Sequence, residues 1–264
     1  MKNKIILVLV LVLVGAVVIF ALNKEPAEVP EVPFEPENNG QSFEEGIDVV
    51  SYSEKNELFD ITVNYPQFEL ASEAFNDSIK EFVEDAVKTF KEIAEENWEA
   101  RKEFDKTLLE YPETPFYFET GWRSAQSNEN YISCIINYYS FSGGAHGDSV
   151  IKTFNFDVLE QEEISFSDFV GNSQENLNKI AELVTIELEN QILSDAEGEQ
   201  SEILQSMIDE GANPVFKNYE NFVFDENNLT VCFQKYQVAP GSFGLLEVEI
   251  NKNELEELDL PYFE

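Results

Sequence analysis

The chain has 264 residues, with 53 acidic and 16 basic side chains, and its formal net charge at pH 7 is −37. Every acidic residue follows Lys24, so the part beyond it carries a still larger negative excess. Such a field repels nucleic acid and attracts cationic partners. Because phosphate contacts need Lys and Arg, nucleic-acid binding is excluded as a main role. A solvated acidic surface and a surface that steers a basic protein both remain open.

The amino end has the pattern of a membrane anchor. Residues 1–4 carry two lysines, and the apolar run 5–22 that follows them holds no charge. A spanning helix needs about 20 apolar residues, and Lys and Arg stay on the cytoplasmic side. We therefore expect a cytoplasmic stub (1–4), a single transmembrane anchor (5–22) and an extracytoplasmic remainder at the cell membrane. Cleavage after Ala21, which would give a secreted protein, is the alternative.

The remainder is predicted to be a linker followed by two α+β subdomains. Residues 23–42 alternate prolines with glutamates, a composition typical of an extended spacer. Strand and helix patterns then divide the chain into an N-terminal subdomain, 43–170, and a C-terminal subdomain, 171–264. The order of the elements indicates an α+β fold with mostly antiparallel sheets, one long helix and one medium helix.

In the N-terminal subdomain, alternating apolar residues predict one or two half-buried strands within 46–65, ended by Pro66. Apolar residues at spacings of three and four then predict a long helix from Ser72 to about Leu109. Three strands follow: 116–125, 131–141 and 149–158.

In the C-terminal subdomain, a helix is expected over 174–193, with Ser173 as its N-cap. A shorter helix, 202–210, is expected to end at Gly211. The remaining elements are strands at 216–224, 229–238 and 245–250 and a final helical turn at 254–258.

The chain lacks the common signatures of catalysis. His146 is its only histidine, and no nucleophile elbow, zinc pattern, P-loop or dinucleotide fingerprint is present. The interpretation is that the protein is not an enzyme and has no catalytic residues, metal site or cofactor. The His146 imidazole is expected to bond to backbone in a tight turn. An acid-type hydrolase that uses two of the many carboxylates remains as an alternative.

The two cysteines, Cys134 and Cys232, would lie in an oxidising compartment, where disulfides persist. Each is inside a predicted strand, and sequence cannot place their Cα atoms together. A Cys134–Cys232 disulfide and two free thiols therefore both remain open.

Two loops rich in Gly and Pro interrupt the strands, at 142–148 and 239–244. Glycine permits close approach of another backbone, and loops on a rigid sheet often carry binding sites. The predicted ligand-binding residues are Gly143, Gly144, Ala145, His146, Gly147, Ala239, Pro240, Gly241 and Ser242.

Three segments resemble a bacterial extracytoplasmic family that pairs a PdaC-like domain (DUF4163) with an RsiV-like domain (DUF3298). They are Asn-Tyr-Tyr-Ser-Phe-Ser-Gly-Gly-Ala-His-Gly (137–147), Thr-Phe-Asn-Phe-Asp (153–157) and Gln-Lys-Tyr-Gln-Val-Ala-Pro-Gly-Ser-Phe-Gly (234–244). Gly241 and Ser242 stand where the family often has Tyr and Ala. The resemblance covers about 46–258.

The resemblance implies that the exported part receives a protein ligand, because in anti-sigma members this part receives lysozyme. Only residues 1–4 precede the predicted anchor, so no direct sigma-factor binding is expected. Deacetylase members carry their metal-binding residues in a separate catalytic domain.

The leading hypothesis is a membrane-anchored extracytoplasmic module. It would bind lysozyme-like or other cationic envelope proteins through the loops 142–148 and 239–244. The alternative is a domain that binds peptidoglycan or another cell-wall glycan, with Trp98, Trp122 or the tyrosines against the sugar.

Overall fold

The computed structural model describes residues 46–108, 110–194 and 196–263. The predicted stub (1–4), anchor (5–22) and linker (23–42) lie outside these residues and stay predictions. Within the described ranges, no helix combines the length and the apolar character that crossing a membrane requires. The predicted α+β class with mainly antiparallel sheets is confirmed.

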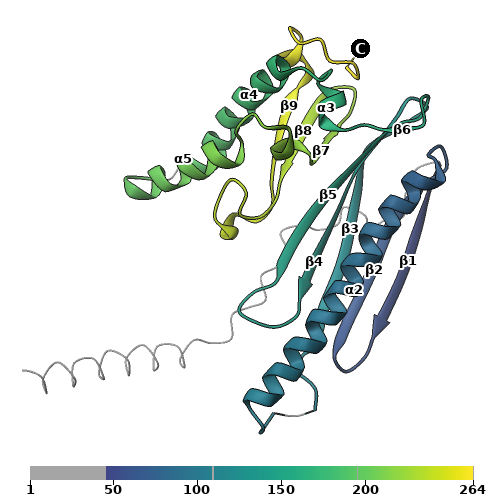
Figure 1. Cartoon of the computed structure of the whole chain (residues 1–264), viewed down its shortest axis with the longest axis vertical. Coiled ribbons are helices and arrows are strands. Elements are labelled where there is room, and N and C mark those ends of the chain that lie inside the picture. Colours follow the sequence, from purple (N-terminus) through teal and green to yellow (C-terminus); the bar gives the residue numbers. More distant parts are fainter. Residues whose placement is uncertain (1–45, 109, 195, 264) are drawn as a thin grey trace, which may run out of the picture. The chain divides into compact units, whose positions relative to one another are not determined.

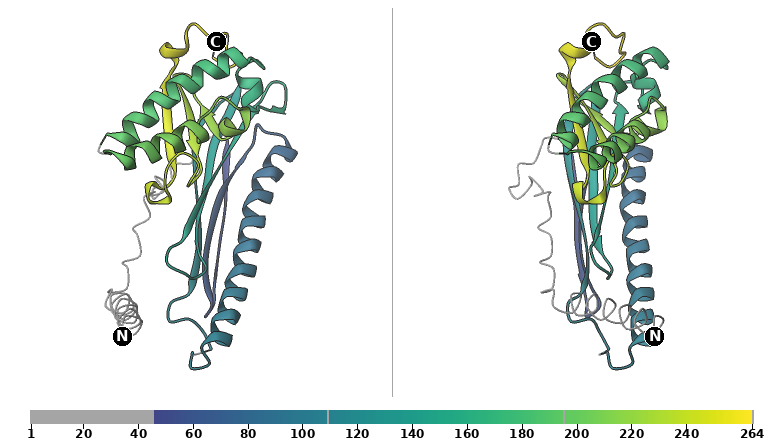
Figure 2. Two further views of the ribbon diagram at one scale, coloured as in Figure 1. Left: turned by 60° about the vertical axis from the view of Figure 1, so that its left-hand side comes forward. Right: turned by 90° about the vertical axis from the view of Figure 1, so that its left-hand side faces the viewer.

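The first part of the described chain is a six-stranded sheet with a long helix on one face (Figures 1 and 2). The strands follow one another in chain order, and only β2 and β3 are parallel. A parallel pair needs a long crossover, which α2 supplies. The elements are β1 (Ile47–Lys55), β2 (Phe59–Phe68), α2 (Glu73–Phe104), β3 (Phe116–Ser127), β4 (Tyr131–Phe141), β5 (Asp148–Asp157) and β6 (Glu162–Glu163).

Helix α2 forms because a regular apolar stripe follows a good N-cap. The Ser72 side chain accepts a hydrogen bond from the Phe75 backbone amide at 3.2 Å, which is the usual bond of an N-cap residue. The helix ends at Phe104, before the predicted end, because the Asp105 carboxylate bonds the Thr107 amide and competes with the helical pattern. Its buried side chains are Phe75, Ile79, Val83, Val87, Phe90, Ala94 and Trp98.

Strand β1 is more exposed than the half-buried strand that was predicted. Val49 and Val50 are 42 % and 36 % exposed, because β1 is the edge strand of the sheet and only its first residue is buried.

Strand β2 runs through Pro66, which was predicted to end it. The Asn64 backbone N–H points toward β3, where it donates to Thr120 Oγ1. Pro66 is two residues further along β2, so the N–H that it lacks would face the same edge of the strand. The hydrogen-bond ladder between β2 and β3 covers only residues 59–62 and has ended before Pro66. A strand tolerates proline where no ladder bond is needed.

The second part of the chain is a three-stranded antiparallel sheet with α4 and α5 beside it (Figure 1). Its elements are α3 (Phe166–Phe169), α4 (Gln174–Leu193), α5 (Glu199–Gly211), the 3₁₀ turn η1 (Phe216–Tyr219), β7 (Phe222–Phe224), β8 (Asn228–Phe233), η2 (Gly241–Phe243), β9 (Leu246–Asn251) and η3 (Lys252–Leu255). Helix α4 has the predicted bounds, and Ser173 accepts from the Asn176 amide as its cap.

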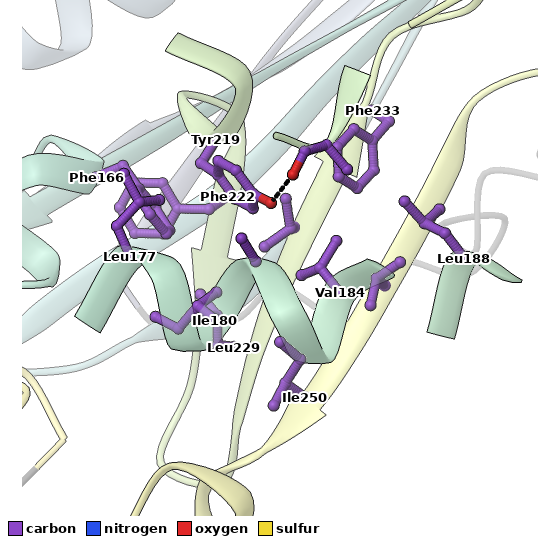
Figure 3. Close-up of a cluster of buried hydrophobic side chains, with 14 of the residues drawn as sticks. Phe166, Leu177, Ile180, Val184, Leu188, Tyr219, Phe222, Leu229, Phe233 and Ile250 are labelled. Atoms are coloured by element: carbon purple, nitrogen blue, oxygen red, sulfur yellow. Dashed lines mark hydrogen bonds between the residues drawn. The ribbon is translucent and has the colours of Figure 1, made fainter. Parts of the chain in front are cut away.

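The core of this part lies between α4 and the three strands (Figure 3). Leu177, Ile180, Val184 and Leu188 line the inner face of α4 and are fully buried. They meet aromatic rings of η1 and the strands, including Phe222. The Tyr219 hydroxyl keeps a partner inside this core by donating to the Ala212 carbonyl at 2.6 Å, as a buried phenol requires.

Two predicted strands of this part need correction. The strand predicted over 216–224 is the turn η1 followed by the short β7, because Phe216 to Tyr219 close 3₁₀ bonds. The strand predicted over 229–238 stops at Phe233, where the backbone turns. Gly211 is the last residue of α5, and close packing demands glycine there: a Cβ would lie 2.0 Å from the Gln237 carbonyl oxygen.

The two sheets share a buried polar seam. Ser133 and Asn155 lie on the face of β4 and β5 opposite α2, and Ser133 donates to Asn155 Oδ1 at 2.6 Å. The Phe224 amide donates to Ser133 Oγ, and Asn155 Nδ2 donates to the Phe222 carbonyl. Thr153 Oγ1 likewise accepts from the Phe222 amide. Side chains of the large sheet therefore satisfy the backbone of β7. The division predicted after residue 170 stays a prediction.

Candidate functional site

The loop 142–148 has a shape that requires its glycines. Gly143 and Gly144 adopt φ angles of +102° and +104°, a region that side chains with a Cβ rarely enter. Gly147 is buried, and a Cβ there would lie 2.2 Å from the Tyr139 ring. His146 Nδ1 lies 2.9 Å from the Gly147 carbonyl oxygen, so the imidazole bonds to backbone as the sequence predicted.

This loop lies against α2 and forms a small pocket with it. Asn97 Nδ2 on α2 donates to the Ser142 carbonyl at 3.0 Å. The pocket has a volume of about 230 Å³, and its lining includes Gly143, His146 and Gly147 but no residue of 239–244. The two predicted loops therefore do not line this pocket together.

The second loop is less accessible than expected. Ala239 is 3 % exposed and belongs to the core beside α4, so it cannot contact a ligand. Pro240 and Gly241 are half-buried, whereas Ser242 is exposed. The loop also carries Phe243, which is 38 % exposed.

A four-residue turn, Gln234–Gln237, lies in the chain between β8 and the loop 239–244 and is here called the 234–237 turn. Gln234 bonds both the amide and the carbonyl of Ile151 on β5. Gln237 Nε2 donates to the Gly211 and Asn218 carbonyls at 3.1 and 3.0 Å. The turn is therefore fixed at both ends.

Lys235 ties this turn to the loop 142–148. Its Nζ donates to the Gly147 carbonyl at 3.2 Å and lies 3.4 Å from an oxygen of Asp148. The lysine side chain is only 13 % exposed, so the pair is better shielded from water than most surface ion pairs.

Tyr236 is the residue that the turn presents to solvent. Its ring is 57 % exposed although its φ angle is +71°. Such a backbone conformation is strained for a bulky residue, and strain of this kind clusters at functional sites. The ring packs over Gly241, where a Cβ would lie 2.3 Å away. Tyr236 thus supplies an aromatic surface beside the position where the family often has Tyr.

Sequence reasoning missed Lys235 and Tyr236 as members of this surface, whereas Asp148 lies in the predicted binding loop 142–148. Lys235 and Tyr236 are inside the motif 234–244, which was the available signal, but they fell within a predicted strand. We call the surface made by Asp148, Lys235, Tyr236 and Gly241, with the Gly147 carbonyl beneath it, the turn face.

The environment near the turn face keeps the Tyr138 hydroxyl protonated. Burial raises the pKa of the Tyr138 hydroxyl, and the Asp148 charge raises it further. Among the described residues, no group of three or more His, Cys, Asp or Glu side chains is placed to hold a metal ion. The turn face therefore offers an aromatic ring, a lysine and a carboxylate for recognition.

The cysteines do not form the disulfide that was left open. The structure has Cys134 and Cys232 as free, buried thiols. Cys134 packs in the core beneath α2, whereas Cys232 lies between the two sheets. Burial raises the pKa of both thiols.

Two sequence families match the chain, in the order predicted from its motifs. Residues 52–149 match the family described as Deacetylase PdaC, and residues 167–253 match the Protein of unknown function DUF3298. A curated relative is the peptidoglycan-N-acetylmuramic acid deacetylase PdaC of Bacillus subtilis (strain 168), at 26 % identity over 218 residues. The alignment covers 80 % of this chain and 41 % of that protein, so the chain spans less than half of the relative's length.

A solved structure shows the same fold. A DUF3298 family member from Bacteroides fragilis NCTC 9343 superposes with a TM-score of 0.53 at 22 % identity, covering 82 % of this chain and 94 % of its own. A DUF3298 family protein from Pseudomonas aeruginosa PAO1 gives a TM-score of 0.48 at 13 % identity, covering 81 % and 94 %. The predicted resemblance is therefore confirmed.

The family and relative names overturn one prediction. The chain was expected not to be an enzyme, yet the family that matches 52–149 is described as a deacetylase and the curated relative is named as one.

Proposed function

Since the chain joins a PdaC-family domain to a DUF3298-family domain, we propose that it works outside the cytoplasm at the bacterial cell wall, where its turn face binds a lysozyme-like or other cationic envelope protein. The cell-wall setting follows from the relative's name, which specifies peptidoglycan. The observation that carries the binding proposal is Tyr236, an exposed aromatic residue with a strained backbone on a turn fixed at both ends.

The chemistry of the turn face suits a cationic partner. Tyrosine is enriched at binding hot spots, and its ring attracts Lys and Arg side chains that lie over its face. The Asp148 side chain is 65 % exposed and can pair with a second cation. The net charge of −37 steers basic proteins toward the chain over long distances and raises the association rate.

The proposal is tested by calorimetric titration of the exported part with a basic lysozyme. Tyr236→Ala is expected to weaken binding by about tenfold or more, as removal of an interface aromatic anchor does. Gly241→Ala is expected to act in the same direction because its Cβ displaces the Tyr236 ring. The matched control is Tyr111→Ala, since Tyr111 is also exposed (39 %) but lies after α2.

Two results would contradict the proposal. One is the absence of binding at low salt, where electrostatic attraction is strongest. The other is equal weakening by Tyr236→Ala and Tyr111→Ala, which would mean that the negative field attracts the lysozyme without a defined site.

A part in peptidoglycan deacetylation is the second candidate, and the names of the matching family and relative favour it. It predicts release of acetate from peptidoglycan in the presence of the purified chain. A heat-unfolded sample is the control, and equal acetate release from both samples would eliminate this candidate.

A further inference from the structure

A larger pocket lies at the outer edge of β5, and its lining shares no residue with the turn face. Its volume is about 560 Å³, within the range of about 300–1,000 Å³ typical of small-molecule sites. Its walls come from four places in the chain: the start of α2, strand β5, the segment from β6 to α3, and the turn η1. Such a wall, built from distant segments of the chain, is fixed only by the complete fold.

Two lysines in this pocket stand out in so acidic a chain. Lys152 is half-buried and Lys217 is exposed, and both line the pocket. Most basic residues that the structure describes are paired with carboxylates or lie over aromatic rings. Within the same described residues, Lys152 and Lys217 have no ion pair, hydrogen bond or ring contact. Two unpaired cations on one pocket are available for an anionic group of a ligand.

The other lining groups complement an anionic ligand that also has hydroxyls and an apolar face. Phe82 and Phe216 are half-buried and line the pocket, so their rings offer apolar surface. Glu163 and Glu220 are exposed, without an ion pair among the described residues, and carboxylates only accept hydrogen bonds at neutral pH. They suit ligand hydroxyl and amide N–H groups.

Resting on the proposed location at the cell wall, we infer that this pocket binds a carboxylate-bearing amino sugar of the wall glycan. The sugar carboxylate pairs with Lys152 and Lys217, the ring packs against Phe82 and Phe216, and the hydroxyl and acetamido N–H groups donate to the glutamates. An acidic peptide would use the lysines equally well. Its additional carboxylates would be repelled by Glu163 and Glu220, however, whereas the amino sugar brings a single carboxylate, and the observations therefore favour the saccharide.

The test compares two sugars that differ by one group. N-acetylmuramic acid carries a lactyl carboxylate, which N-acetylglucosamine lacks. Titration of the isotope-labelled chain, followed by NMR, is expected to give a dissociation constant of about 1 mM for the acid. The constant for N-acetylglucosamine is expected to be at least about fivefold weaker, because it forms no charge-assisted bond. Shifts should map to β5 and η1.

Variants identify the pocket. Lys152→Met keeps most of the aliphatic stem and is expected to reduce affinity for N-acetylmuramic acid about fivefold while leaving N-acetylglucosamine unchanged. Lys106→Met is the matched control: Lys106 is also exposed and lies beyond the far end of α2. Thermal unfolding verifies that both variants are folded.

Equal binding of the two sugars, equal effects of the two variants, or no shifts at β5 and η1 would overturn the inference. Preferential binding of an acidic peptide to the same lysines would also overturn it. The lysozyme titration depends on Tyr236 and uses neither lysine, so failure of one proposal is distinguishable from failure of the other.

Discussion

Cys134 and Cys232 show how burial in this fold controls the chemistry of single residues. Burial is the main cause that raises the pKa of each thiol above its ordinary value. An unfolded thiol ionises near pH 8.5, whereas both buried thiols keep their protons to higher pH. The unfolded state therefore loses protons first as pH rises. It follows that the thiols favour folding fully below about pH 8.5 and progressively less above it.

We predict that the free energy of unfolding falls between pH 8.5 and pH 9.5 by about 1 kcal/mol for each thiol. Urea unfolding at closely spaced pH values measures it. A Cys134→Val, Cys232→Val double variant is the control and should show a flatter curve over this range. Tyrosines such as Tyr138 also have raised pKa values, but unfolded tyrosine ionises only near pH 10. Parallel curves for the two proteins would contradict the assignment to the thiols.

At the scale of elements, the short strand β7 depends on side chains of another sheet. Asn155 donates to the Phe222 carbonyl at 2.8 Å and accepts from the Ser133 hydroxyl at 2.6 Å. All these groups are buried, so removing the amide leaves polar atoms without partners. We predict that Asn155→Ala lowers the free energy of unfolding by about 2–4 kcal/mol, measured by urea denaturation.

Asn190→Ala is the matched control for this prediction. Asn190 is exposed at the end of α4, and its replacement should change stability by less than about 0.5 kcal/mol. Equal stability of the two variants would show that the polar seam does not hold β7 in place.

The elements differ in how far sequence could predict them. The stripe of α2 and the N-cap Ser173 of α4 are local signals, and both helices were found. Pro66 led to a wrong prediction of the end of β2. Whether a proline ends a strand depends on which edge of the strand still carries a hydrogen-bond ladder, and here the position of β3 decides it. The break after Phe233 was missed for a similar reason. Its turn is held by Gly211 and Ile151, which lie far away in sequence.

At the scale of the whole molecule, sequence located the segments of the turn face without its organisation. The glycines of 142–148 were visible as a loop. The hydrogen bond from Lys235 to Gly147 joins residues 88 positions apart, however, and no local sequence pattern predicts such a contact. Ala239 was chosen as a ligand contact and is instead part of the core. The pocket beside β5 was missed entirely, because its walls come from four separate segments.

Net charge acts on the whole molecule as well. With 53 acidic and 16 basic residues, like-charge repulsion in the compact state opposes folding. Salt screens that repulsion, with a Debye length of about 10 Å at 0.1 M. We therefore predict that the melting temperature at pH 7 rises by several degrees between low salt and about 0.5 M NaCl. Each kcal/mol shifts the Tm of a domain of this size by about 2–4 °C.

The control is the same series near pH 4.5, where many carboxylates are protonated and the salt effect should shrink. A melting temperature at pH 7 that is constant or falls with added NaCl would contradict self-repulsion. Salt must also weaken capture of a cationic protein while it stabilises the fold. Loss of binding together with a higher melting temperature therefore separates screening of the docking field from unfolding.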